Sequence, residues 1–164
     1  MKKYNDTLEI GCAEIMDWRM GERIDIKITT TSTRVMDMRD MRGFSDNSFV
    51  FIKASAVFEH VSFADQIKTV KEMYRILAPN GLVWLQLPDV DYWRARLFSP
   101  DEKEREWAQV QLEGGKRDEF DFHRGLIRMD DLKRLLRKHG FEIVWAKNGS
   151  ECAGSIDLVA EAIK

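Results

Sequence analysis

The chain of 164 residues has the length of one ordinary domain, so we predict a single domain over residues 1–164. It contains 44% hydrophobic and 33% charged residues, which is enough apolar material for a core and excludes wholesale disorder. Lys plus Arg is 26 and Asp plus Glu is 28, and this near-neutral balance disfavours nucleic acid as the default partner.

The cysteines and histidines give no sign of a disulfide framework or a metal site. The two cysteines, Cys12 and Cys152, show neither CxxC nor a common zinc spacing, and the three histidines show no metal-ligand spacing, so we predict no metal. The longest apolar runs are short and interrupted by charge, which predicts no membrane span. The first ten residues lack the apolar segment of a signal peptide, and a reduced cytoplasmic location is the simplest expectation.

Short apolar or alternating stretches predict seven strands. Residues 23–28 alternate apolar and polar positions, as a strand with one buried face does. Residues 49–52 (FVFI) and 82–87 (LVWLQL) are nearly continuous apolar runs, typical of central parallel strands covered on both faces. The other predicted strands lie at residues 8–11, 34–38, 141–145 and 156–163, with an Asn-Gly-Ser turn at 148–150 between the last two.

One helix is strongly predicted between the two apolar strands. Ser62 stands where an N-cap is expected, with Asp65 three residues later. The sequence Ala-Pro-Asn-Gly at 78–81 would end the helix, because proline and glycine do not continue a helical turn easily. The apolar face of this helix consists of Phe63, Ile67, Val70, Tyr74 and Leu77.

The C-terminal half contains further helical segments. A helix is predicted over residues 130–139, with Asp130 as its cap and Gly140 as its stop. Residues 92–113 are predicted to be helical with a break at Ser99-Pro100, and residues 114–128 to form a long charged loop. These elements together predict the α/β class, with an antiparallel pair at one edge of the sheet.

Residues 44–89 contain a Phe-x-Asp-x-Ser-Phe segment, a strand, a Glu-His pair, a Glu-x-x-Arg-x-Leu helix end, a Pro-x-Gly turn and a strand ending in Pro-Asp. The residues that make up these motifs are Phe44, Asp46, Ser48, Phe49, Glu59, His60, Glu72, Arg75, Leu77, Pro79, Gly81, Pro88 and Asp89. A block of this shape is common in class I S-adenosylmethionine-dependent methyltransferases, which this chain resembles. Residues 8–12 (LEIGC) are similar to the first strand and glycine turn of that family, and the resemblance continues loosely to the C-terminus.

The resemblance implies a Rossmann-like sheet of seven strands, one of them antiparallel, with S-adenosylmethionine at the C-terminal ends of the first strands. The general rule for ligand sites in open α/β sheets points to the same edge. Three features depart from the family pattern. No second glycine follows Gly11 before Gly21, Val50 replaces a frequent aspartate, and residues 8–28 are too few for a complete strand–helix–strand unit of ~30 residues. The first crossover helix is therefore predicted to be missing or very short.

The chemistry of the methyl donor then assigns candidate binding residues. Gly11 would let the backbone approach the amino-acid part of the donor, since glycine has no Cβ. Asp25 would accept hydrogen bonds from the ribose hydroxyls, or else be a solvated residue on an edge strand. Asp37 with Met38 would contact adenine, or Asp37 would instead cap a turn against Arg39 or Arg42. The remaining candidates, expected to form the floor of the methyl-transfer site, are Ala54 and Ser55.

Two histidines are candidates for a catalytic base. His60 follows the fourth strand at the ligand edge of the sheet, and His123 lies in the charged loop, from which it could cover a substrate. The alternative for His60 is that it and Glu59 hold the loop through hydrogen bonds. A base is needed only for a hydroxyl or ammonium acceptor, because alignment can supply most of the catalysis of methyl transfer.

The predicted function is therefore methyl transfer to a small-molecule, glycan or lipid-linked acceptor. A first alternative is a non-catalytic methyltransferase-like binding protein that has lost a complete donor site. A second is a nicotinamide- or nucleotide-binding enzyme on a similar sheet, which the absence of GxGxxG disfavours. The sequence alone does not identify the acceptor or the oligomeric state.

Overall fold

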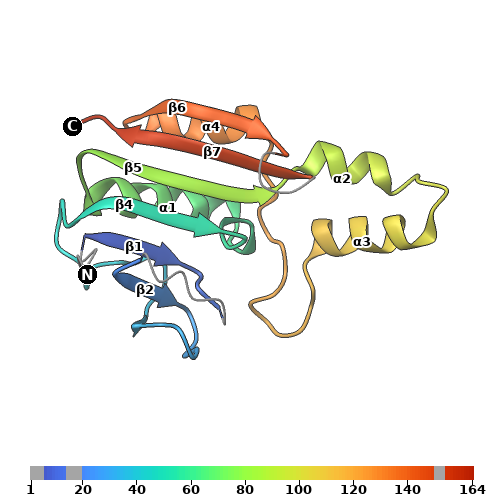
Figure 1. The fold of residues 1–164 in the computed structure, drawn as a ribbon, viewed down its shortest axis with the longest axis horizontal. Coiled ribbons are helices and arrows are strands. Elements are labelled where there is room, and N and C mark those ends of the chain that lie inside the picture. The colour runs from blue at the N-terminus through green and yellow to red at the C-terminus, as the bar shows by residue number, and fades with distance from the viewer. Residues whose placement is uncertain (1–5, 14–19, 150–153) are drawn as a thin grey trace.

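A computed structural model describes residues 6–13, 20–149 and 154–164. Its centre is a seven-stranded sheet in the order β3-β2-β1-β4-β5-β7-β6 (Figure 1). The pairs β1–β2, β1–β4, β2–β3 and β4–β5 are parallel, whereas β7 runs antiparallel to both β5 and β6. The predicted mostly parallel sheet with an antiparallel C-terminal pair is confirmed. The predicted turn at 148–150 and the first crossover fall partly on residues 150 and 14–19, which lie outside the described residues.

Several strand ends differ from the prediction. The second and third strands are shorter than predicted, and the residues that follow Asp25 and Val35 form part of the wall of a cavity. The fourth strand is longer and continues to Ser55, since the neighbouring fifth strand pairs with it over that length. The strands are β1 Thr7–Ile10, β2 Glu22–Asp25, β3 Arg34–Val35, β4 Phe49–Ser55, β5 Leu77–Pro88, β6 Phe141–Asn148 and β7 Ser155–Ala162.

The predicted strong helix is α1, Phe63–Ile76. Its predicted N-cap is confirmed, because the Ser62 side chain accepts a hydrogen bond from the Asp65 backbone N–H at 3.3 Å. The helix ends one residue before Leu77, where β5 begins directly. Residues 78–81 therefore do not separate helix from strand as predicted, but form an irregularity within β5, with Asn80 at a φ of 62°.

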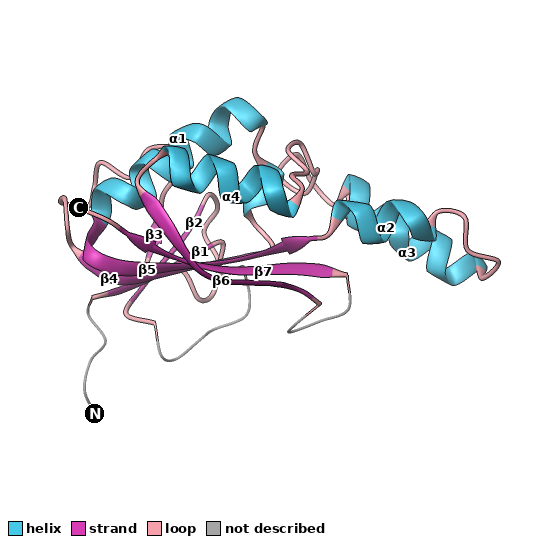
Figure 2. Cartoon of the chain, turned by 90° about the horizontal axis from the view of Figure 1, so that it is seen from above, coloured by secondary structure: helices cyan, strands magenta, loops and turns pink. Residues whose placement is uncertain are grey.

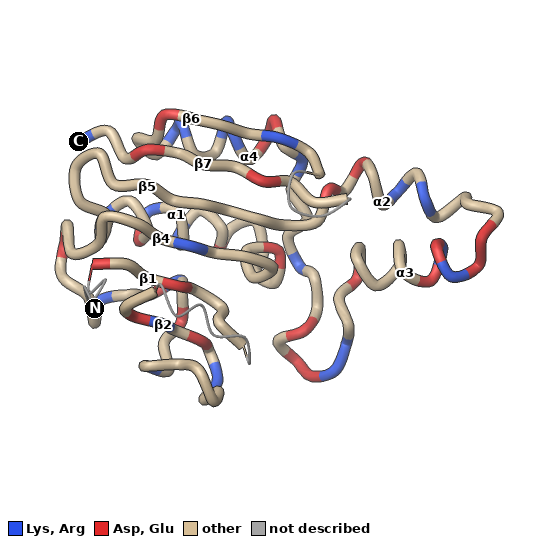
Figure 3. The backbone as a smooth tube through the Cα atoms, viewed as in Figure 1, with Lys and Arg blue, Asp and Glu red and all other residues tan. Residues whose placement is uncertain are grey.

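The remaining helices follow the predicted pattern with one correction. Two helices, α2 Val90–Arg96 and α3 Glu102–Glu113, flank the predicted break at Ser99-Pro100, and together they extend away from the sheet (Figure 1). The helix α4 spans Met129–Lys138, so Asp130 lies in its first turn and is not its cap. Residues 114–128 form the predicted loop, in which acidic and basic residues are interspersed (Figure 3).

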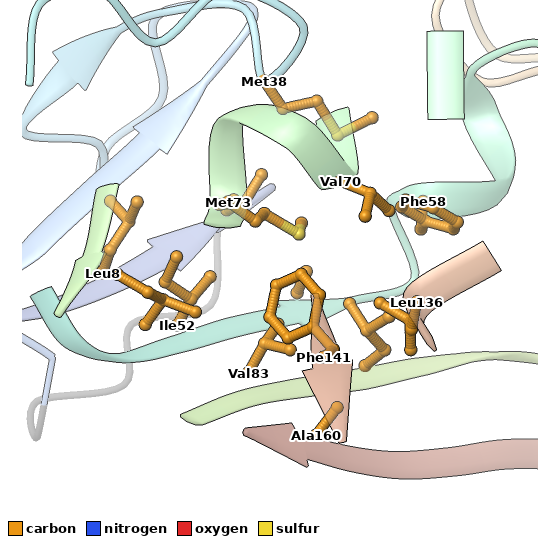
Figure 4. Packing of buried hydrophobic residues seen from close by; sticks show 14 of the residues in the cluster. Leu8, Met38, Ile52, Phe58, Val70, Met73, Val83, Leu136, Phe141 and Ala160 are labelled. Atoms are coloured by element: carbon orange, nitrogen blue, oxygen red, sulfur yellow. The ribbon is translucent and has the colours of Figure 1, made fainter. Parts of the chain in front are cut away.

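The helices α1 and α4 lie on the same face of the sheet (Figure 2). The central strands were expected to be covered on both faces, but among the described residues helices cover only one of them. The core therefore lies between one sheet face and these two helices, where side chains such as Phe58, Met73, Leu136 and Phe141 interlock (Figure 4). In the part of the chain that the structure describes, no helix is both long and apolar enough to cross a membrane.

The structure explains why part of the 44–89 block has its sequence pattern. The Arg75 guanidinium donates to the backbone carbonyls of Phe44 and Met41, both at 2.9 Å, and forms ion pairs with Glu72 and Asp46, both at 2.8 Å. The Glu72 carboxylate also accepts from the Met41 backbone N–H at 2.6 Å. These residues fasten the loop before β4 to α1, which is a structural role.

Candidate functional site

A cavity of about 590 Å³ lies at the C-terminal ends of β1, β2 and β4. The parallel strands end at this edge together, and the loops that follow them form its walls. Among the predicted site residues, the cavity is lined by Gly11, Asp25, Asp37, Met38 and His60. Five of the eight candidates, distant in sequence, therefore meet around one space.

Gly11 directly follows β1 and has a conformation that suits glycine. Its φ is 72°, and its backbone N–H donates to the Ile24 carbonyl at 2.9 Å, which ties the turn to β2. A Cβ at this position would lie 2.5 Å from Cγ2 of Val57, on the segment after β4. The turn is therefore compact for two reasons, its left-handed backbone and its close neighbour.

We expect Gly11→Ala to destabilise the protein. The positive φ alone should cost about 1–2 kcal/mol, and the contact with Val57 adds to it. Urea unfolding of the wild type, Gly11→Ala and the double variant Gly11→Ala/Val57→Ala separates the two causes. The second substitution should restore part of the loss, because it removes the clash and leaves the φ unchanged. Equal stability of all three chains would contradict this view of the turn.

Asp25 lies at the last position of β2, where the strand reaches the cavity. Its carboxylate accepts from the backbone N–H groups of Ala13 and Lys27, each at 3.1 Å. A carboxylate has about four acceptor sites, so two bonds leave capacity for a ligand hydroxyl. Asp25 is thus a polar group on the cavity wall that also orders the two loops around it.

Asp37 and Met38 both line the cavity, but their side chains differ in how free they are to contact a ligand. The Asp37 carboxylate accepts from the Arg39 Nε at 2.9 Å, and this bond to the guanidinium holds the pKa of Asp37 below its usual range. The alternative interpretation, in which Asp37 caps a turn against Arg39, therefore has a structural basis. Asp37 also lies on the cavity wall. Met38 is buried and offers an apolar surface.

Ala54 and Ser55 are close to the cavity without lining it. Ala54 is fully buried and pairs with Ile10 of β1, directly before the Gly11 turn. The Ser55 hydroxyl bonds to Oε1 of Gln86 on β5 at 2.8 Å. The residues of this segment that do line the cavity are Ala56 and Val57, one and two positions later.

His60 and His123 come together although they are 63 positions apart in the sequence. Their rings form an edge-to-face contact with centroids 4.8 Å apart, and only His60 lines the cavity. Glu59 lies beside them, with Oε1 at 3.9 Å from Nε2 of His123. Burial raises the pKa of the Glu59 carboxyl to about 8 and lowers the pKa of both imidazoles.

The charged loop contributes cavity residues that sequence reasoning missed: Arg117, Asp118, Phe120, Asp121 and Arg124. The loop is held in place by backbone bonds, because the N–H groups of Arg124 and Gly125 both donate to the Glu59 carbonyl, at 2.9 and 3.0 Å. Lys27 forms an ion pair with Asp118 from the opposite wall. The only signal in the sequence was the density of charge in the loop.

These features define an α/β domain with a cavity at the C-terminal edge of a Rossmann-like sheet. A sequence model described as a methyltransferase domain matches residues 6–146, and the chain belongs to that family. No curated protein matches the chain in a sequence search.

Solved structures share the fold at low sequence identity. A SAM-dependent methyltransferase from Methanosarcina mazei superposes with a TM-score of 0.65 at 16% identity, over 99% of this chain and 94% of that one. The 1,6-didemethyltoxoflavin-N1-methyltransferase of Burkholderia thailandensis, solved with S-adenosylhomocysteine, gives 0.67 at 11% identity, covering 96% and 71%. For the CurJ carbon methyltransferase the score is 0.63 at 16% identity, and the match spans 96% of this chain but only 48% of that one.

Proposed function

We propose that this protein transfers a methyl group from S-adenosylmethionine to a small-molecule acceptor. The observation that carries the proposal is the meeting of Gly11, Asp25 and the Asp37-Met38 segment around one cavity at the strand ends. Family membership and the neighbour solved with S-adenosylhomocysteine support the choice of donor.

The residues around the cavity suit the parts of this donor. The Gly11 turn offers backbone without a side chain, Asp25 offers an acceptor for ribose hydroxyls, and Met38 offers an apolar surface for adenine. The donor supplies a sulfonium methyl, which an acceptor attacks while the carbon–sulfur bond breaks and its electron pair goes to sulfur. The protein would act mainly by aligning the two reactants.

We also propose that His60 and His123 act on the acceptor side of the cavity. His60 forms part of the wall, and His123 packs directly behind it. Burial lowers the pKa of both rings, which favours the neutral imidazole near neutral pH. A neutral ring nitrogen can receive the proton of a hydroxyl acceptor or bind a cation. The roles proposed for Ala54 and Ser55 become indirect, since they support the segment that ends in Ala56 and Val57.

Binding of S-adenosylhomocysteine tests the donor assignment. At a ligand concentration of 100 times Kd, the folded state should gain about 2.7 kcal/mol, which corresponds to a rise in Tm of roughly 5–10 °C for a chain of this size. Isothermal titration calorimetry should give one site per chain. Adenosine and methionine serve as partial ligands and should bind more weakly. An unchanged Tm and no heat at millimolar ligand would favour the non-catalytic alternative.

A further inference from the structure

Glu59, His60 and His123 form a compact cluster of metal-ligand side chains beside the cavity. One ligand atom from each residue can be chosen so that all three lie within 4.8 Å of one another. Glu59 and His60 are adjacent in the 3-10 helix η1, Phe58–His60, and His123 approaches from the charged loop. The charged loop packs closely against the residue that follows η1. Glycine at position 125 permits this contact, because a Cβ on Gly125 would lie 2.2 Å from the Val61 carbonyl oxygen.

Two polar atoms in this cluster are buried without a partner. Oε2 of Glu59 and Nδ1 of His60 make no hydrogen bond within the described residues, and the Glu59 side chain is only 1% exposed. Leaving a buried polar atom unpaired is costly, so such atoms usually have a ligand, water or ion as partner. The 3.9 Å separation between Glu59 and His123 is too long for a direct hydrogen bond that would satisfy the carboxylate.

The orientation of His123 suits a ligand. Its Nδ1 lies 2.9 Å from the Gln111 carbonyl oxygen, which can only accept, so Nδ1 carries the hydrogen. In a neutral ring the lone pair is then on Nε2, the nitrogen nearer Glu59. Metal-binding histidines are typically fixed in this way, by donating the second ring N–H to a carbonyl or carboxylate.

We propose that Glu59, His60 and His123 bind one divalent transition-metal cation, of which zinc is the best probe. Two imidazoles and one carboxylate suit zinc, manganese, iron or cobalt, whereas calcium and magnesium prefer oxygen ligands. Ligand atoms around a tetrahedral zinc are about 3.3 Å apart. Side-chain rotations that shorten the widest separation by about 1.5 Å would close the site.

The cation would face the reaction space, since His60 lines the cavity. Three protein ligands leave a position open, as in catalytic zinc sites, and an acceptor oxygen could occupy it. The bound cation would then lower the pKa of that oxygen, in place of an imidazole base. This use of the cation rests on the proposed function, but binding of the cation does not.

Zinc binding to the full chain tests the site. Metal-free protein is titrated with Zn²⁺ against a chromophoric chelator, for the wild type and for Glu59→Gln, His60→Gln and His123→Gln. We expect the wild type to bind one zinc per chain. Each of the three variants should bind zinc more weakly, by a factor larger than the ~10–100-fold that loss of an outer-shell partner causes. His139→Gln is the matched control, because it also removes a histidine but lies at the end of α4. It should bind like the wild type.

A measurement on the wild type keeps the test valid if a variant fails to fold. Stoichiometric zinc should shift the imidazole NMR signals of two histidines and leave the third, His139, unchanged. No zinc bound at micromolar concentration, equal affinity in all variants, or a shift of His139 alone would overturn the site. S-adenosylhomocysteine binding is measured on the metal-free protein, so failure of the donor assignment is seen separately from failure of the metal site.

Discussion

Replacing Asp25 by alanine should weaken S-adenosylhomocysteine binding by about 1.5–3 kcal/mol, the range for hydrogen bonds to a charged group. This corresponds to a roughly 10- to 150-fold higher Kd by calorimetry. The reason is the position of the carboxylate at the end of β2, on the cavity wall, with acceptor capacity beyond its two backbone bonds.

The Asp25 variant needs controls, because the same carboxylate holds the backbone N–H groups of Ala13 and Lys27. Some loss of stability is therefore expected beside the loss of affinity. The two bonds use different carboxylate oxygens, so Asp25→Asn keeps an acceptor for only one of them, and it should still be more stable than Asp25→Ala. Asp40→Ala removes an aspartate that pairs with Arg42 and does not line the cavity, so the affinity of this variant for S-adenosylhomocysteine should match that of the wild type. A folded Asp25→Ala chain with unchanged Kd would refute the assignment.

The fold was predictable where hydrophobic patterns and capping residues agree. The runs at β4 and β5 and the Ser62-capped helix between them carry period, length and boundary signals at once. The ends of β2 and β3 were not predictable, because the residues after Asp25 alternate like a strand but instead form the cavity wall. Alternation reports which side chains are buried and carries no information about which backbone is paired.

Some residues of the candidate site were likewise predictable from the sequence, and others were not. Gly11 and Asp25 were predictable because they directly follow or end strands, and strand ends meet at one edge. The approach of His123 to Glu59 and His60 was not predictable, since residues 114–128 have no periodicity and are positioned by backbone bonds to the Glu59 carbonyl. Glu59 is buried at this contact, and the sequence did not indicate its burial either.

The Arg75 cluster shows that a family-like motif can be structural. Four groups accept from or pair with this one guanidinium: two backbone carbonyls, Glu72 and Asp46. The loop that it holds leads from the Asp37-Met38 segment to β4, so the same contacts support one wall of the cavity. The motif therefore contributes to ligand binding through the position of a loop rather than by touching the ligand.

We expect Arg75→Ala to destabilise the fold by about 1.5–3 kcal/mol, measured by urea unfolding, because bonds to a charged group are lost and the Glu72 carboxylate loses its main partner. Arg75→Lys should recover only part of this, since an ammonium lacks the planar fork that reaches several acceptors. Lys71→Ala, on the same helix, is the control and should stay within about 0.5 kcal/mol of the wild type.

The pH dependence gives this prediction a second readout. The bond to Arg75 lowers the pKa of Glu72 below its usual 4.5, so the ion pair stabilises the folded state above that pH. As the pH falls through the lowered pKa, Glu72 becomes protonated and this contribution is lost. The difference in unfolding free energy between wild type and Arg75→Ala should therefore be largest near pH 7 and shrink below about pH 4.5. A difference that is constant from pH 7 to pH 3 would mean that the carbonyl bonds to Phe44 and Met41, and not the charge on Glu72, account for the role of Arg75.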